Sequence, residues 1–143
     1  MNSTLRPSEI KVLIRGGGDL ASGIAWRLHQ CGFRVLITEI SHPLSVRRKV
    51  SFCEAVYDGE TEVEAVKAVL VRAIEEAPTV WNRGEIPVLV DPACETKDSM
   101  RPEVLVDAII AKKNLGTSVQ NAPLVIAVGP GFEVGRDAHF GVE

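Results

Sequence analysis

The chain has 143 residues, of which 45% are hydrophobic and 24% are charged, and its formal net charge is −3 at pH 7. This length suits one domain with its own core, and the small negative charge argues against a general attraction to nucleic acid or to anionic membranes. The three cysteines are widely spaced, no apolar run approaches about 18 residues and no signal-peptide pattern opens the chain, so we expect a cytoplasmic protein without disulfides or a membrane span.

The clearest local pattern follows a short polar lead-in over residues 1–9. The apolar run at residues 10–14 predicts a strand, and a glycine-rich turn comes directly after it. From Leu20 to about Gly32, apolar residues recur at helical spacing, which predicts a helix. A second apolar run at residues 34–39 predicts the next strand.

The turn between the first strand and the helix has the pattern of a dinucleotide-binding loop, G-x-G-x-x-G/A. Its residues are Gly16, Gly17, Gly18, Asp19, Leu20 and Ala21. Gly16 suits the tight turn and Gly18 the close approach of the backbone to a pyrophosphate. The first amides of the helix have no intrahelical partner, so they can bind a phosphate. We therefore predict a nucleotide-type ligand, although the glycines are also compatible with a compact turn that binds nothing.

Two acidic residues bear on the identity of that ligand. Glu39 ends the second strand, at about the distance from Gly18 at which an acid binds a ribose 2′-hydroxyl. Its charge would oppose a 2′-phosphate, so we expect an NAD-like ligand in preference to NADP. Asp19 stands at the mouth of the helix and would repel a phosphate unless its side chain points away or caps an amide.

Strand-like and helix-like segments alternate along the rest of the chain. Strands are predicted at residues 54–57, 86–90 and 124–128, and residues 138–143 resemble the opening of another. Helices are predicted at residues 41–49, 61–77 and 102–113, with a turn at 82–84. This alternation is typical of a parallel sheet with helices on its faces.

We therefore predict an α/β fold, a single three-layer Rossmann-like domain over residues 10–143. Its parallel sheet would have about five strands in the order 3-2-1-4-5, with helices on both faces. In this order the carboxyl ends of the first and fourth strands lie side by side at the switch point, where open α/β sheets bind ligands.

Further candidate ligand-binding residues follow the predicted strands. They are Arg47 and Arg48, which suit a phosphate; Asp58 and Asp91, which suit a ribose, a pterin amine or an ion; and Gly129 and Gly131, whose loop amides could line the crevice. The alternatives are a solvated surface for the arginines and ordinary turn chemistry for the other four. Cys94 suits either a thiolate donor or a small buried filler. No metal-ligand set, general base or catalytic residue is identified.

Several segments together resemble a known family. They are residues 12–23, 46–48, 54–59, 90–92, 106–114 and 129–132. The chain resembles the selenium-dependent molybdenum hydroxylase accessory proteins of the YqeB type, which are distant relatives of the XdhC accessory proteins. The resemblance runs from about Ile10 to the end of the chain.

The resemblance implies a cytoplasmic bacterial protein with a Rossmann-like domain that assists maturation of a molybdenum-dependent hydroxylase. It implies a hydroxylase apoenzyme as partner and the molybdenum cofactor, or its dinucleotide form, as the ligand handled at the glycine turn. Members of this family continue past the position of Glu143, so we expect this chain to lack their C-terminal part.

Two other functions remain open at this point. One is the cofactor domain of an NAD-dependent oxidoreductase whose substrate-binding half lies elsewhere. The other is a non-catalytic scaffold that docks a partner. The sequence favours a cofactor-binding accessory protein over a self-sufficient enzyme, and it leaves the oligomeric state open, a homodimer included.

Overall fold

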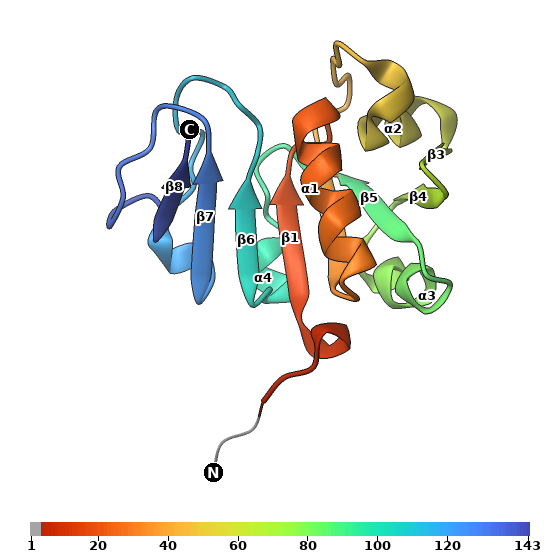
Figure 1. Cartoon of the computed structure of the whole chain (residues 1–143), viewed down its shortest axis with the longest axis horizontal. Coiled ribbons are helices and arrows are strands. Elements are labelled where there is room, and N and C mark those ends of the chain that lie inside the picture. Colours follow the sequence, from red (N-terminus) through yellow and green to blue (C-terminus); the bar gives the residue numbers. More distant parts are fainter. Residues whose placement is uncertain (1–3) are drawn as a thin grey trace.

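The strands predicted at residues 10–14 and 34–39 form the centre of an eight-stranded sheet in the computed structural model, which describes residues 4–143 (Figure 1). The strands are β1 (Lys11–Arg15), β2 (Arg34–Glu39), β3 (Glu60–Val63), β4 (Val66–Val71), β5 (Ile86–Val90), β6 (Val104–Asp107), β7 (Leu124–Val128) and β8 (Phe140–Val142). Their order is β3-β4-β5-β2-β1-β6-β7-β8, and every pair is parallel except β3 with β4. The predicted α/β class is confirmed, and the arrangement is consistent with a Rossmann-like fold.

The predicted strand number and order are wrong. The strand at residues 86–90, β5, lies beside β2 and not beside β1. The other neighbour of β1 is β6, a segment predicted to be helical. The switch point therefore lies between β1 and β6, because the chain leaves β1 for β2 on one side and returns to the other side with β6.

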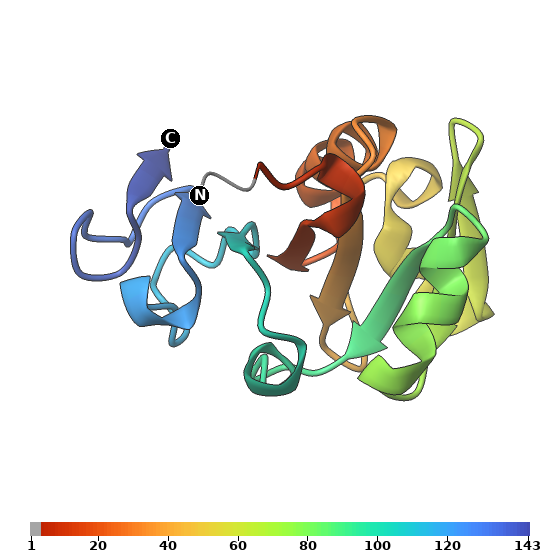
Figure 2. The same cartoon turned by 90° about the horizontal axis from the view of Figure 1, so that it is seen from below.

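Helices cover both faces of the sheet, as predicted (Figure 2). The side chains of β1 alternate between the two faces. Val12 and Ile14 pack on one face with Ala25 of α1 (Asp19–Gln30). Leu13 packs on the other face with Ala77 of α3 (Ala77–Asn82). The remaining helices are α2 (Ala55–Asp58) and α4 (Lys97–Met100), with 3-10 turns at η1 (Pro7–Glu9), η2 (Arg48–Val50), η3 (Phe52–Glu54), η4 (Ile74–Glu76) and η5 (Val119–Asn121). None of the helices within residues 4–143 has the length and apolar character needed to cross a bilayer.

The helix predicted at residues 61–77 is instead a β-hairpin, β3 and β4. Its two-residue turn, Glu64 and Ala65, has φ of 45° and 68°, the left-handed conformation of a hairpin turn, without the usual Asn-Gly. The turn places Val63 opposite Val66. A separation of three residues suits both a helix face and a tight hairpin, which explains the wrong prediction.

The helix predicted at residues 102–113 is also wrong, because its core is strand β6. Leu105 and Val106 are both buried, one on each face of the sheet. A strand covered on both faces is a nearly continuous apolar run, so it has no period of two to distinguish it from a helix.

Two predictions between β2 and β3 are wrong as well. Residues 41–49 form a loop that reaches only the 3-10 turn η2, and residues 54–57 belong to η3 and α2 and not to a strand. Phe52 donates its backbone N–H to Oγ of Ser22 at 2.8 Å, and Cys53 donates its own to the carbonyl of Gly17 at 2.9 Å. These contacts hold the segment against α1 and the glycine turn. The predictions of α1, of the turn that follows α3 and of a strand near residues 138–143 are confirmed.

Candidate functional site

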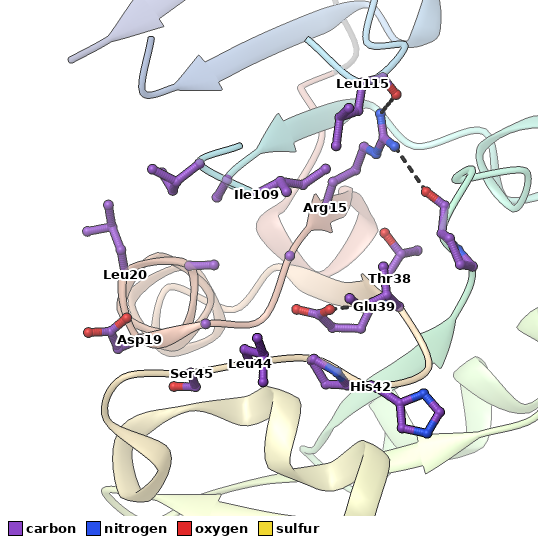
Figure 3. A pocket seen from close by; sticks show the side chains of 18 of the residues that line it. Arg15, Asp19, Leu20, Thr38, Glu39, His42, Leu44, Ser45, Ile109 and Leu115 are labelled. Carbon is purple, nitrogen blue, oxygen red and sulfur yellow. Dashed lines mark hydrogen bonds between the residues drawn. The ribbon is translucent and has the colours of Figure 1, made fainter. Parts of the chain in front are cut away.

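A cavity of about 500 Å³ lies at the carboxyl ends of the central strands (Figure 3). Its walls come from the glycine turn with the start of α1, from the end of β2 and the loop that follows it, and from segments after β5 and β6. The lining residues outside the turn and α1 are Arg15, Thr38, Glu39, Ile40, His42, Pro43, Leu44, Ser45, Val46, Asp91, Pro92, Ala108, Ile109, Ile110 and Leu115. The cavity lies at the edge of the sheet where a ligand was predicted, and residues that follow β2 and β6 line it together with those that follow β1 and β5.

The three glycines of the turn have different structural roles. Gly16 has φ of +103°, and a Cβ atom there would lie 2.9 Å from the carbonyl oxygen of Ala108. A Cβ on Gly17 would lie 3.2 Å from the backbone nitrogen of Cys53. Gly18 has φ of −69°, and a Cβ there would meet no atom within 4 Å. Packing within the protein thus accounts for Gly16 and Gly17, whereas the space beside Gly18 belongs to the cavity.

The first turn of α1 offers unpaired backbone donors to this space. Gly18 is the N-cap and provides no side-chain cap, and the first helical bond to it comes from the N–H of Ser22 at 2.8 Å. Within the described residues, the N–H groups of Asp19, Leu20 and Ala21 have no acceptor. Free amides and the positive end of the helix dipole favour an anion here.

The charge of Asp19 at the helix mouth is partly offset by a neighbour. Its Oδ2 lies 3.7 Å from Nε of Arg47, and both side chains are well exposed to solvent. An exposed pair of this kind contributes little stability, about 0 to 1 kcal/mol. Its effect is local, because the arginine reduces the repulsion that Asp19 would exert on a phosphate.

Glu39 ties the turn to the loop after β2. Its Oε1 accepts the N–H of Gly17 at 2.6 Å, and its Oε2 accepts the N–H of Ile40 at 2.9 Å. Burial raises the pKa of the Glu39 carboxyl above its ordinary range, and these two bonds act in the opposite direction. The carboxylate lines the cavity with one acceptor position on each oxygen already in use, so it has less capacity for a ribose than the sequence suggested.

Arg15 is a cavity residue that the sequence analysis missed. It ends β1 with only 4% of its surface exposed. Its Nη1 donates to the carbonyl of Leu115 at 3.2 Å and to Oγ1 of Thr117 at 2.9 Å, and its Nη2 donates to the carbonyl of Pro92 at 3.1 Å. Thr117 in turn donates to Oδ2 of buried Asp107 at 2.6 Å. An arginine directly before the glycine turn, at the end of the apolar run at residues 12–14, was the available signal.

Several predicted site residues lie outside the cavity lining: Gly17, Arg47, Arg48, Asp58, Gly129 and Gly131. Arg48 pairs with the buried carboxylate of Glu54 at 2.7 Å. Asp58 ends the short helix α2, so the prediction that it follows a strand is wrong.

Gly129 and Gly131, which also lie outside the cavity lining, pack against residues that follow β6. A Cβ on Gly129 would lie 3.5 Å from the side chain of Ile110, and one on Gly131 would lie 2.7 Å from Cα of Lys113. Asp91 does line the cavity, but its carboxylate accepts the N–H groups of Glu95 and Thr96 at 3.0 and 2.8 Å, which is its predicted alternative role in a turn.

The rim of the cavity is unusually apolar for a surface. Six exposed hydrophobic side chains line it: Leu20, Ile40, Leu44, Val46, Ile110 and Leu115. Leu44 and Val46, on the loop after β2, are 92% and 93% exposed. Exposed apolar surface beside convergent polar groups is typical of a binding site. The apolar rim suits contact with the faces of a planar ring.

The three cysteines differ in burial, and we therefore expect them to differ in thiol reactivity. Cys31 is exposed, whereas Cys53 and Cys94 are buried. Burial raises the pKa of Cys53 to about 11, and burial is also the main reason why the pKa of Cys94 is raised. We expect Ellman's reagent at pH 7.5 to label one thiol rapidly in the folded protein and all three in denaturant. Rapid labelling of a Cys31→Ser variant would contradict this and restore Cys94 as a candidate thiolate.

Comparison with known proteins relates the chain to one curated relative. The chain is 50% identical over 132 residues to uncharacterized protein YqeB of Escherichia coli strain K12. This alignment covers 92% of the chain and 24% of the relative. The chain thus spans about a quarter of that protein's length. It matches no model of a protein family and no solved structure. The name of the relative assigns it no ligand or reaction.

Proposed function

We propose that the chain binds a nucleotide-bearing ligand in the cavity beside Gly18 and acts as an accessory protein in the maturation of a molybdenum-dependent hydroxylase. One observation supports the proposal that the chain binds such a ligand. The unpaired amides of Asp19, Leu20 and Ala21 open onto a space that no protein atom fills. A phosphate placed there accepts these hydrogen bonds and interacts favourably with the helix dipole.

The size and chemistry of the cavity support the same class of ligand. A volume of about 500 Å³ lies within the usual range for small-molecule sites, about 300 to 1,000 Å³. Leu44 and Val46 supply apolar surface for a base or a pterin. The carboxylate of Glu39 opposes an additional phosphate on the ribose.

The hydroxylase part of the proposal rests on the family resemblance. The ligand would then be the molybdenum cofactor or its dinucleotide form, and the partner would be the hydroxylase apoenzyme. The similarity to YqeB is compatible with this proposal. The carboxylates of Glu39 and Asp91 hold backbone amides, which supports a binding role over a catalytic one.

An NAD-dependent oxidoreductase is the second candidate, because one titratable ring lies on the cavity wall. His42 lines the cavity and contacts Oγ of Ser41 through Nδ1 at 3.2 Å. An imidazole can act as a general acid or base in catalysis. Oxidation of NADH with a small carbonyl substrate, lost in a His42→Ala variant, would favour this function over the accessory role.

The binding proposal is tested with purified protein and a panel of ADP, GDP, NAD and FMN. We expect at least one nucleotide to raise the midpoint of thermal unfolding by roughly 5 to 10 °C at about a hundred times its dissociation constant. Native mass spectrometry of gently purified protein should also show a bound nucleotide or pterin. A folded protein that shows neither a shift nor a bound mass would overturn the proposal.

A further inference from the structure

The cavity has a second polar feature, the guanidinium of Arg15, which points away from α1 in the close-up of the site (Figure 3). Its hydrogen bonds use both N–H groups of Nη1 and one of Nη2. Since a guanidinium has five N–H donors, the Nε–H and one Nη2–H are left without an acceptor in the described part of the chain.

One of these free donors is open to solvent. Among residues 4–143, every fully buried side-chain nitrogen has a hydrogen-bond partner. The Nε of Arg15 has none, so it is not fully buried, and the cavity is the solvent space that Arg15 borders. The guanidinium thus presents an unused, positively charged donor to the cavity.

The charge of Arg15 has no direct ion pair within residues 4–143. The nearby carboxylate of Asp107 is reached only through the hydroxyl of Thr117. Two backbone carbonyls and this hydroxyl already fix the orientation of the guanidinium, so its binding to a ligand requires little further loss of conformational freedom. A held cation of this kind is well prepared to bind an anionic oxygen, since charge-assisted hydrogen bonds are among the strongest in proteins.

The position of Arg15 separates it from the amides of α1. Its register partners in the sheet are Thr38 and Asp107. Residues two apart on a strand share a face, so Arg15 lies with Leu13 on the face of α3, whereas α1 covers the other face. A ligand that reaches both sites must cross the carboxyl edge of the sheet.

We propose that Arg15 binds a second anionic group of the ligand, separate from the phosphate on the first turn of α1. This inference rests on the proposed nucleotide binding and adds a ligand class to it. The ligand carries two anionic oxygen groups, the two neighbouring phosphates of a diphosphate or one phosphate and a carboxylate. A nucleoside monophosphate engages only one of the two sites.

The test compares ADP with AMP by isothermal titration calorimetry on three proteins: wild type, Arg15→Gln and Thr117→Val. The wild type should bind ADP about tenfold more tightly than AMP. Arg15→Gln should lose most of this preference and change the AMP affinity by less than about threefold. Thr117→Val keeps the guanidinium and its two carbonyl partners but removes one of the bonds that orient it, so the preference should fall by less than in Arg15→Gln.

The outcomes separate this inference from the proposed function. Equal weakening of ADP and AMP by Arg15→Gln, or an unchanged preference, would show that Arg15 only supports the loops and would overturn the inference. Arg15→Lys provides a second variant with the charge retained and fewer donors, in case Arg15→Gln does not fold. It should give a preference between those of the wild type and a variant without the cation, and equal weakening of ADP and AMP in this variant would also overturn the inference. A wild type that binds no nucleotide would overturn the proposed function itself.

Discussion

Replacement of Gly16 by alanine is expected to lower the free energy of unfolding by about 3 kcal/mol, which corresponds to a fall of roughly 10 °C in the thermal midpoint. The reason is twofold. The backbone at Gly16 has φ of +103°, and the new Cβ would lie 2.9 Å from the carbonyl oxygen of Ala108. That oxygen belongs to rigid backbone at the end of β6, so the turn and the strand must shift apart. Thermal and urea unfolding measure the effect.

The matched control is the same substitution two residues later. Gly18→Ala places its Cβ in open space at φ of −69°, so the free energy of unfolding should change by less than about 1 kcal/mol. Equal stability losses for the two variants would contradict the different roles assigned to these glycines. A wild-type midpoint for Gly16→Ala would contradict the turn geometry.

Replacement of Gly18 by leucine is expected to reduce nucleotide affinity at least about a hundredfold while the protein remains folded. A leucine side chain at this position occupies the space in front of the α1 amides, so a phosphate loses those hydrogen bonds and the access to them. The measurement is calorimetric titration with the tightest-binding nucleotide, together with circular dichroism of the variant.

Gly23→Leu is the control for this variant. Gly23 lies in the same helix, is exposed to solvent and does not line the cavity, and a Cβ there meets no atom within 4 Å. We expect unchanged affinity and slightly greater stability, because leucine is a better helix former than glycine. Wild-type affinity in Gly18→Leu would show that the ligand does not bind at the first turn of α1. Loss of binding in both variants would point to a general effect on the helix.

Some of these features could be predicted because they depend on residues close in the chain. The apolar run of β1, the glycine turn and the periodic face of α1 occupy consecutive segments, so pattern and turn chemistry were sufficient for them. The hairpin β3–β4 and the buried strand β6 were missed for a different reason. A two-residue turn without glycine imitates helical spacing, and a strand covered on both faces has no alternation.

The local unit of strand, glycine turn and helix was therefore determined by the sequence, together with the edge of the sheet where the cavity lies. The neighbours of β1 and the surroundings of Arg15 depended on the folded chain. The partners of Arg15 are Pro92, Leu115 and Thr117, which are 77 to 102 residues away along the chain. Only long-range packing brings these groups together. In the sequence, Arg15 is simply the last residue of a predicted strand, whereas in the folded chain it is a buried cation on the wall of the cavity.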